Sequence, residues 1–289
     1  MGYESVADAY RRATIGLTAK ELTTHYSDGI DEFHSSFVPH LKRELSKLSG
    51  DEWQFDDYVA YAAGSDVDMM GHIVEAMIDR EGVVLYPGDW FGFMVGSSHQ
   101  EKIKWTSNSA GKMACLCIPS VRNGHVTDEM FSYLDEANSC LLNINLYPTL
   151  SPAERKGVAA VLNSVLEKSI VSVSFSRGFG MTASQLGVIL VHKDNPLRKR
   201  YDQQWKWYSY FYNQIATRTF MQINGEDLSV VDDRRRVEVS DWLTSKGLPV
   251  VGSGSYYVKS FRPEGDLPDY FRPLMRGKLL RLCFKPTPV

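Results

Sequence analysis

Runs of four to seven residues in which almost every position is apolar recur along the middle of the chain, at 83–86, 113–118, 141–147, 170–175 and 186–191. A half-exposed strand alternates apolar and polar residues, whereas a strand buried on both faces reads as a continuous apolar run. These runs alternate with stretches of helical periodicity, which is typical of a doubly wound sheet. The pattern therefore predicts an α/β fold whose central domain has three layers, α/β/α.

Two of the helical stretches begin at recognisable N-terminal caps. Ser65 is followed three residues later by Asp68, and apolar residues then recur at helical spacing, at Val67, Met70, Ile73, Val74 and Met77. Ser151, Pro152 and Glu154 combine an N-cap, a proline at the first helical position and an acid at the third. With the runs at 141–147 and 170–175, this second helix predicts a right-handed βαβ unit.

The C-terminal part of the chain predicts a second, smaller unit. Its expected elements are an aromatic-rich helix, a second helix that Gly247 and Pro249 end, and two strands, at 199–222, 228–246, 252–261 and 279–284. The chain thus divides into an N-terminal helical segment or arm, a large α/β domain, and a linking helix with a small α+β domain, at 1–54, 55–195 and 196–289.

Composition and charge exclude several classes of protein. The 289 residues include 32 Lys and Arg against 35 Asp and Glu, a net charge of −3, which argues against a nucleic-acid partner. The apolar runs are far too short to cross a bilayer, and the first twelve residues lack the apolar stretch of a secretory signal. We therefore expect a cytoplasmic protein without a membrane partner.

The four cysteines are Cys115, Cys117, Cys140 and Cys283. Most of them lie within apolar runs, so we expect buried free thiols and not a disulfide framework. Cys115 and Cys117 alternate within an expected strand and have no second pair of ligands at zinc spacing, so no metal site is expected.

The most informative segment reads Ser174-Phe175-Ser176-Arg177-Gly178-Phe179-Gly180 and is followed by Gln185-Leu186-Gly187. It resembles the signature of fold-type-I enzymes that depend on pyridoxal phosphate (PLP), above all the class I/II aminotransferases. Their pattern is Ser-x-Ser-Lys-x-Phe-Gly, followed at the same spacing by Arg or Lys, one residue, and Gly. The resemblance implies an aminotransferase-like fold and a PLP-type cofactor.

Further landmarks follow in the order of that family, so that the resemblance covers roughly residues 55–289. It implies that Gly64, Ser65 and Asp66 bind the cofactor phosphate at a helix start, and that Trp90 stacks on the pyridine ring. It places 118–124 at the family's Asn-Pro-Thr-Gly loop and 142–147 at its Asp-x-x-Tyr strand end. The last landmark, Arg281 on the terminal strand, would bind the α-carboxylate of an amino-acid substrate.

Elementary chemistry agrees with these assignments. A Ser-capped helix start offers free N–H groups and the positive end of the helix dipole to a phosphate. Ser174 and Ser176 follow a strand at the sheet edge where open α/β folds bind ligands. Trp90 offers a flat apolar face, and Arg281 a planar donor that matches a carboxylate.

The departures from the family pattern concern the groups that hold and activate the cofactor. Arg177 stands at the Schiff-base lysine, and a guanidinium can neither form an aldimine nor act as an ordinary base. Asn145, or Asn143 in a shifted register, replaces the Asp at the pyridine nitrogen, and a neutral amide stabilises a protonated ring less well. Gln185 replaces the phosphate-binding Arg, and Ser120 or Val121 the loop Asn. These changes argue against ordinary transamination.

Other residues remain as alternatives. A lysine elsewhere could replace the missing amine, at Lys112, Lys193 or Lys199. Arg177 is interpreted either as a clamp for a phosphate or carboxylate, or as a structural arginine paired with an acid. His99 and His125 are candidate proton shuttles or merely solvated loop residues.

Two aromatic features also allow two interpretations. Tyr147 either contacts the cofactor, in a catalytic role, or packs in the core. The aromatic residues at 205–212 belong either to the core or a dimer interface, or to a pocket for a flat substrate.

Two functions are therefore expected from the sequence. The first is an aminotransferase-like enzyme of amino-acid or natural-product biosynthesis that binds PLP or its amine form (PMP) noncovalently and an amino acid through Arg281. The alternative is a repurposed PLP fold, either a cofactor-independent enzyme with an anionic substrate or a noncatalytic partner protein. The resemblance implies a homodimer in each case, because the family's pocket forms between two subunits.

Overall fold

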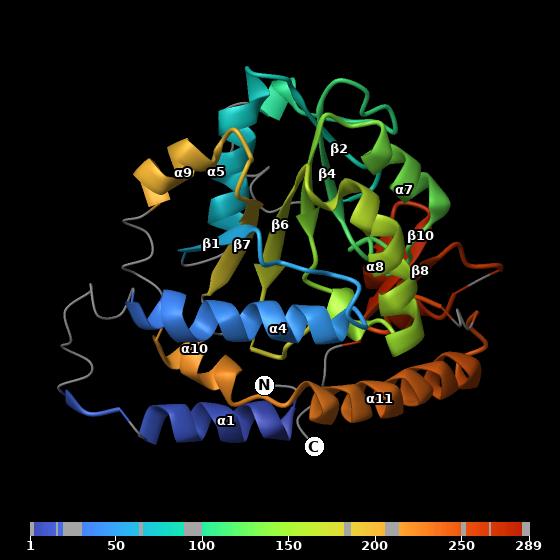
Figure 1. Ribbon diagram of the computed structural model, residues 1–289. Helices are drawn as coiled ribbons and strands as arrows, with labels where there is room; N and C mark the ends of the chain where they lie inside the picture. Colours follow the sequence, from blue (N-terminus) through green and yellow to red (C-terminus); the bar gives the residue numbers. More distant parts are fainter. Residues whose placement is uncertain are drawn as a thin grey trace.

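The computed structural model describes residues 3–15, 17–19, 31–63, 66–89, 100–181, 186–205, 214–249, 253–265 and 267–284. A mixed sheet lies at its centre, between helices on either face (Figure 1). The strands that form it are β1 (Tyr58–Ala63), β2 (Val83–Leu85), β3 (Lys104–Trp105), β4 (Met113–Cys117), β5 (Ser139–Asn143), β6 (Ser169–Ser174) and β7 (Gly187–His192). Their spatial order is β1-β7-β6-β5-β4-β2-β3.

Strand direction distinguishes one edge of this sheet from the rest. The five strands from β3 through β2, β4 and β5 to β6 are all parallel to one another. β7 is antiparallel to both of its neighbours, β6 and β1. Its first residue, Gly187, lies between Ser174 of β6 and Ala63 of β1. The β6–β7 connection therefore begins and ends at the same sheet edge, which is the edge where β4 and β5 also end.

The strands alternate between two apolar layers. Ala114 and Leu116 of β4 join the core beneath α4 (Val38–Leu48), α7 (Asp128–Asp135) and α8 (Pro152–Leu166), whereas Met113, Cys115 and Cys117 join the core beneath α5 (Asp66–Ile78) and α9 (Arg198–Trp205). Every residue of β4 is thus buried. The expected three-layer α/β/α domain is confirmed.

Local sequence signals explain several element boundaries. Ser151 caps α8 by accepting a hydrogen bond from Glu154 N, and the Glu154 carboxylate accepts one from Ser151 N (3.0 Å), which completes a capping box. The run at 141–147 was expected to be a strand, but β5 ends at Asn143. The reason is an Asx turn, in which Asn143 Oδ1 accepts a hydrogen bond from Asn145 N (2.9 Å) and bends the chain into the short 3-10 helix η3 (Tyr147–Thr149).

The N-terminal part is helical, as expected, and contributes to the core. It contains α1 (Glu4–Ile15) and a short π-helix, η1 (Phe33–Phe37), that continues into α4. Tyr3, Val6 and Ala9 are buried in the same apolar cluster as the sheet. Helix α1 lies beside α10 (Gln214–Met221), and α11 (Gly225–Ser245) lies at the same side of the molecule (Figure 1).

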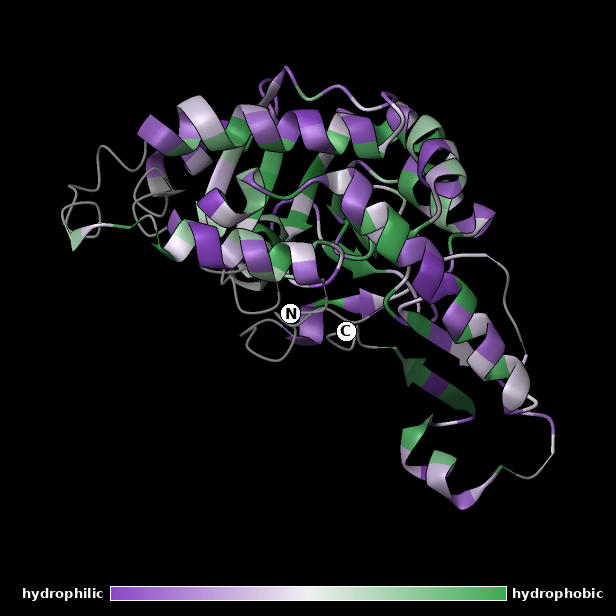
Figure 2. Ribbon diagram, turned by 90° about the horizontal axis from the view of Figure 1, so that it is seen from below, coloured by the Kyte–Doolittle hydropathy of each residue, from purple (hydrophilic) through white to green (hydrophobic). Residues whose placement is uncertain are grey.

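The C-terminal part forms a smaller unit that projects from the main body (Figure 2). Strands β8 (Val258–Phe261), β10 (Leu279–Cys283) and β9 (Met275–Arg276) pair antiparallel, next to the 3-10 helix η5 (Asp269–Leu274). Val239 and Leu243 of α11 pack against Tyr256, Leu280 and Leu282. Of the strand expected at 252–261, the described part is strand only from Val258, and residues 206–213 of the expected long helix lie outside the described ranges.

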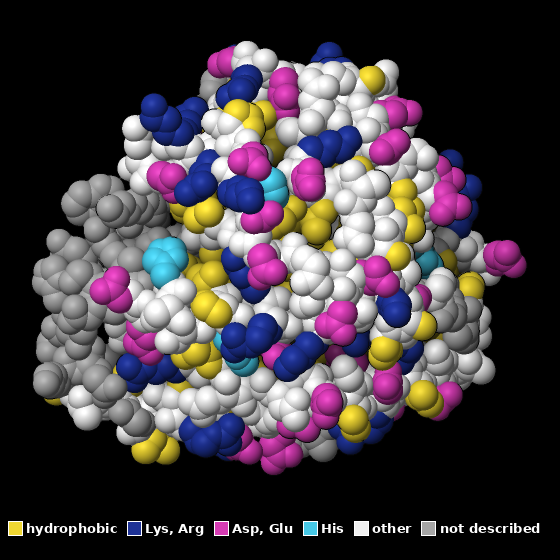
Figure 3. Space-filling view, viewed as in Figure 1, with side chains coloured by type: hydrophobic (Ala, Val, Ile, Leu, Met, Phe, Trp, Pro, Cys, Tyr) yellow, Lys and Arg dark blue, Asp and Glu magenta, His cyan; other side chains and the backbone are white. Residues whose placement is uncertain are grey.

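The surface carries charges of both signs, intermingled over the face seen in Figure 3. No helix within the described ranges is both long and apolar enough to span a membrane. All four cysteines are free; Cys115, Cys117 and Cys140 are buried, and Cys283 is exposed.

Candidate functional site

The turn between β6 and β7 carries Arg177 and is fixed by its own backbone. Met181 N donates to Phe175 O (2.9 Å), Gly180 N to Arg177 O (3.1 Å), and Gly178 N to Asn145 O (3.1 Å). The last of these bonds ties the turn to the residues that follow β5. Residue 177 is therefore held at the carboxyl end of the central strands, where open α/β sheets bind ligands.

Aromatic packing supports the same turn from the core side. The rings of Phe175 and Phe179 lie edge-on to Phe220 of α10, with centroids 5.0 and 5.1 Å apart. Gly180 has φ +69°, and a Cβ there would overlap the ring of Tyr3, so only glycine fits both the backbone and the space. Residues 175–181 of the connection are thus part of the packed structure.

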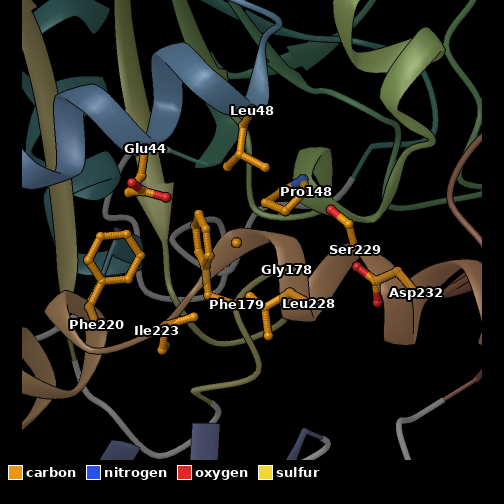
Figure 4. Close-up of a pocket in the computed structure, with 11 residues that line it drawn as sticks. Glu44, Leu48, Pro148, Gly178, Phe179, Phe220, Ile223, Leu228, Ser229 and Asp232 are labelled. Atoms are coloured by element: carbon orange, nitrogen blue, oxygen red, sulfur yellow. The ribbon is translucent and has the colours of Figure 1, made fainter. Parts of the chain in front are cut away.

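A cavity of about 20 Å³ adjoins this turn (Figure 4). Gly178, Phe179 and Leu228 form apolar parts of its wall, and Ser229 and Asp232 of α11 bring polar atoms to one side. A volume of this size holds about one water molecule. It is therefore a packing defect behind the turn and not a substrate pocket.

Arg177 itself is half-buried and points its guanidinium at the small unit. The guanidinium carbon lies 5.9 Å from the centroid of the Tyr257 ring, which is within cation–π range. No acidic side chain in the described ranges forms an ion pair with it. The described part of the chain thus offers no acid for the structural interpretation, and the anion clamp remains a prediction.

Two serine hydroxyls lie beside Arg177. Ser174 Oγ and Ser176 Oγ are 3.0 Å apart, with Ser174 buried and Ser176 half-buried. Both stand at the sheet edge that the sequence pattern indicates for them.

The two asparagines after β5 have different surroundings. Asn143 is the last residue of the strand, and its Nδ2 contacts Met70 Sδ of α5 at 3.5 Å. Asn145 lies in the following turn, where its backbone carbonyl accepts the hydrogen bond from Gly178 N and its buried Oδ1 has no hydrogen-bond partner among the described residues. A buried acceptor without a donor is costly in free energy, so Asn145 Oδ1 marks a place where a donor is missing.

The loop after β4 is fixed by a carboxylate that sequence reasoning missed. Asp89 is 2% exposed, and its two oxygens accept hydrogen bonds from Cys117 N (2.9 Å) and Ser120 Oγ (2.7 Å). Burial raises the pKa of Asp89 to about 6, against the opposing effect of these bonds and of Arg122. The sequence signal was a polar residue directly after a strand, in Pro87-Gly88-Asp89, but its partners are about thirty residues away in the chain.

The small unit binds the same loop from the other side. Arg281 Nη2 donates to Val121 O (2.7 Å), and Ser260 Oγ donates to Arg122 O (2.6 Å). Ser260 and Arg281 are register partners on β8 and β10, so both side chains belong to one face of the small sheet. Among the described residues, the bond to Val121 is the hydrogen bond that the Arg281 side chain forms.

Tyr147, expected either at the cofactor or in the core, lies in the core. It is fully buried, its ring stacks on Trp53 with centroids 4.6 Å apart, and its hydroxyl donates to Arg155 O (2.7 Å). This position gives no support to a catalytic role, because the hydroxyl is used within the core. The local sequence could not show this, because the ring is oriented by Trp53, which is distant in the chain.

The three lysines proposed as substitutes for the missing amine lie away from Arg177. Lys112 precedes β4 and Lys193 follows the antiparallel β7, so both stand at the opposite edge of the sheet. Lys193 also pairs there with Asp57 (2.8 Å), and Lys199 lies in the first turn of α9 after that edge. Position in the fold therefore removes these alternatives.

The remaining predicted residues are partly or wholly undescribed. Gly64, Ser65, Trp90, His99 and Gln185 lie outside the described ranges. Asp66 begins α5, but its side chain is not described. His125 is half-buried, and burial together with Lys259 lowers its pKa. In the described part of the chain, no group of three His, Cys, Asp or Glu residues could hold a metal ion.

No protein-family model and no curated protein matches this sequence, but solved structures share the fold. An aspartate aminotransferase from Thermotoga maritima is 12% identical, with a TM-score of 0.65, over 100% of this chain and 85% of that one. A PLP-bound C-S lyase from Staphylococcus hominis is 12% identical (TM-score 0.62, 90% and 71%). An aromatic-amino-acid aminotransferase from Burkholderia pseudomallei, covalently bound to PLP, is also 12% identical (TM-score 0.59, 90% and 77%). The chain therefore has an aminotransferase-like α/β fold.

Proposed function

We propose that this chain is an aminotransferase-like enzyme of amino-acid or natural-product biosynthesis that works without a Schiff-base lysine. It would bind PLP or PMP noncovalently and an amino-acid substrate through the carboxylate. The observation that carries the proposal is the guanidinium of Arg177, which stands in the β6–β7 turn directly after Ser174 and Ser176. The fold of the PLP-bound neighbours supports the cofactor class.

The residues present fit a noncovalently held cofactor. Asn145 Oδ1 is a buried acceptor for which the described part of the chain supplies no donor, and the hydroxyls of Ser174 and Ser176 lie at the same sheet edge. These groups, with Ser65 and Trp90 from the sequence, would hold a polar aromatic ring and its phosphate. The described lysines at the opposite edge offer no tether.

Each residue then has a defined task. When bound, the cofactor supplies an electron sink for charge that develops next to its ring. Arg281 orients the substrate by a bidentate hydrogen bond to its carboxylate. Arg177 holds an anionic group and moves no proton, because a guanidinium stays protonated. Proton transfer would fall to a histidine such as His99.

Titration with PLP and with PMP tests the proposal. We expect saturable binding of one or both, followed by near-visible absorbance, and no covalent adduct after borohydride treatment. Substitution Arg177→Lys restores an amine at the turn, so the variant should gain a reducible aldimine with PLP. A folded Arg177→Lys variant that binds PLP without forming one would contradict the placement of residue 177 at the cofactor.

A second candidate function, a repurposed fold without the cofactor, is favoured by one observation. The Asn143 amide at the end of β5 is a neutral group already engaged by Asn145 N and Met70, so the described strand end offers no carboxylate to a pyridine nitrogen. Failure of both PLP and PMP to bind the folded wild-type chain would favour this cofactor-independent or noncatalytic alternative.

We further propose that the protein is a homodimer, as the resemblance implies. Sedimentation velocity at micromolar concentration should show a single species of twice the chain mass. A monomer at these concentrations would overturn this proposal without affecting the fold.

A further inference from the structure

The connection that follows β4, residues 118–125, is bound from two sides. On the side of the central sheet, Ser120 Oγ donates a hydrogen bond to the buried carboxylate of Asp89 (2.7 Å). On the side of the small unit, Arg281 Nη2 of β10 donates one to Val121 O (2.7 Å). Two consecutive residues thus connect the carboxylate of Asp89 to the guanidinium of Arg281.

Asp89 holds this connection by more than one interaction. Its second oxygen accepts a hydrogen bond from Cys117 N at the end of β4 (2.9 Å). Burial disfavours the ionised carboxylate, whereas the backbone N–H of Val121 and the guanidinium of Arg122 favour it. That guanidinium lies against Gly88, where a Cβ would overlap it. The backbone of the connection therefore takes its position from the carboxylate of Asp89.

Hydrogen bonds within the connection make it compact. Gly124 N donates to Ser120 O (2.8 Å), and Ser120 N donates to His125 O (3.0 Å). Arg122 N donates to Ser120 Oγ (3.2 Å), which is the hydroxyl that binds Asp89. Because these bonds close the connection on itself, we expect a displacement at Ser120 to reach the side that faces the small unit.

The small unit fits this second side closely. Ser255 N donates to Gly124 O (2.8 Å), and a Cβ at Gly124 would overlap backbone carbonyl oxygens of the small unit. Ser260 Oγ donates to Arg122 O (2.6 Å). Since Ser260 is the register partner of Arg281, both side chains bind the connection from one face of the small sheet.

The orientation of Arg281 depends on where the Val121 carbonyl lies. The strand fixes only the backbone of Arg281, and its long side chain is half-buried. Such a side chain loses rotamer freedom when it is held in one orientation. A hydrogen bond that is already formed in the free protein removes this loss from the free energy of ligand binding.

We propose that Asp89 is a positioning residue for Arg281, because it fixes the segment whose carbonyl orients the guanidinium. That the oriented guanidinium receives a carboxylate ligand rests on the proposed function, whereas the positioning itself requires no ligand. The sequence did not show this relation, because Asp89 is 31 positions from Ser120 and Arg281 is 160 positions from Val121.

Arginine-selective ¹⁵N NMR of the whole chain tests the positioning directly. A guanidinium whose Nη2 is hydrogen-bonded rotates slowly about its Nε–Cζ bond, so its two Nη nitrogens give separate resonances. We expect separate Nη resonances for Arg281 in the wild type, assigned by their absence in Arg281→Lys. In Asp89→Ala, exchange between them should be about two- to tenfold faster, the factor that corresponds to the loss of one hydrogen bond.

Two controls separate positioning from a general loosening of the fold. Arg155 is the internal control, because its guanidinium donates to carbonyl oxygens outside the connection, those of Leu48, Pro148 and Leu150. Its exchange rate should stay the same in Asp89→Ala. Asp79→Asn is the matched variant, since it removes an exposed carboxylate that pairs with Lys102, and it should leave the Arg281 resonances unchanged.

Acetate, exchanged for chloride at constant ionic strength, is the carboxylate probe. It should shift the Arg281 resonances of the wild type saturably, and its affinity should be about two- to tenfold lower in Asp89→Ala. Wild-type resonances that do not respond to acetate would reject Arg281 as a carboxylate site, and thus that part of the proposed function. The exchange rates would then still decide on the positioning.

Four results overturn the inference. They are averaged Arg281 resonances in the wild type, an unchanged exchange rate in folded Asp89→Ala, an equal increase for Arg155, and equal acetate affinities of wild type and variant. If Asp89→Ala fails to fold by circular dichroism, Ser120→Ala, which removes the hydrogen bond between Ser120 and Asp89, decides by the same measurements.

Discussion

At the scale of single residues, the carboxylate of Asp89 joins two loops at the carboxyl ends of the parallel strands. It accepts hydrogen bonds from Cys117 N and Ser120 Oγ, and its own backbone carbonyl accepts one from Trp105 Nε1 (2.9 Å). Because the group is buried, its ionised form is destabilised and its pKa rises to about 6. The residue thus fixes the place of the chain just before Trp90.

This raised pKa predicts the sign of a pH effect on stability. Between about pH 4 and pH 6 the folded state holds the Asp89 proton more tightly than the unfolded state, so its contribution to stability is lost as pH rises through that window. Asp89→Asn removes the titration but keeps an acceptor for Cys117 N. The free energy of unfolding of the variant, minus that of the wild type, should increase by about 2 kcal/mol from pH 4 to pH 7, because part of the effect has already occurred at pH 4. Urea unfolding at both values measures it, and parallel pH profiles would reject the assignment.

At the scale of elements, the N-terminus of α8 connects the two units of the molecule. Glu154 completes the capping box with Ser151, and its Oε1 also accepts a hydrogen bond from Gly254 N (2.6 Å) in the segment that leads into β8. These bonds and the nearby Arg236 hold the pKa of Glu154 below its usual value despite its partial burial. The Glu154 carboxylate thereby stabilises both the first turn of α8 and the segment that precedes β8.

The double role predicts unequal effects of two truncations. Ser151→Ala should lower the free energy of unfolding by about 1 kcal/mol, the usual cost of a lost N-cap. Glu154→Ala should cost more, about 2 kcal/mol, because it also leaves Gly254 N without its acceptor. Equilibrium urea unfolding of both variants provides the comparison. Equal losses would mean that the bond to Gly254 contributes nothing.

Elements whose signals are local could be predicted from the sequence, whereas those fixed by distant partners could not. The cap at Ser151 and the buried runs of β4 and β6 are readable because neighbouring residues determine them. β1, with the sequence Tyr-Val-Ala-Tyr-Ala-Ala, was not singled out, because alanine is a poor strand former and only pairing with β7 fixes the strand. In the site, Ser174, Ser176 and Arg177 share one predicted turn, but Asp89 and Tyr257 acquire their roles from partners far along the chain.

At the scale of the whole molecule, the beginning of the chain is joined to its C-terminal part through a buried carboxylate. Asp232 of α11 accepts hydrogen bonds from the hydroxyls of Tyr3 and Tyr256, both at 2.6 Å. The guanidinium of Arg235 lies over the Tyr3 ring at 4.6 Å. Since Tyr3 also covers Gly180, this cluster links the N-terminal helix, the small unit and the turn that carries Arg177.

Removal of one hydroxyl tests how much this cluster contributes. Tyr3→Phe preserves the ring against Gly180 but takes a donor from the buried Asp232, so it should lower the free energy of unfolding by about 1–3 kcal/mol. Tyr10→Phe, at an exposed position of α1, is the matched control and should change stability by less than about 0.5 kcal/mol. Thermal or urea unfolding measures both, and equal effects would show that the buried hydroxyl is unimportant.

The reversed direction of β7 has a consequence for how such a protein can change its chemistry. Because β6 and β7 pair as far as Ser174 and Gly187, both ends of the connection that carries residue 177 are fixed at one pair of neighbouring strands. The side chain of residue 177 is half-buried and belongs to neither apolar layer of the sheet, whereas its neighbours Phe175 and Phe179 are core residues. Chemistry at that point can therefore diverge in a single substitution while the architecture persists, and the same substitution can be reversed at the bench against an unchanged background.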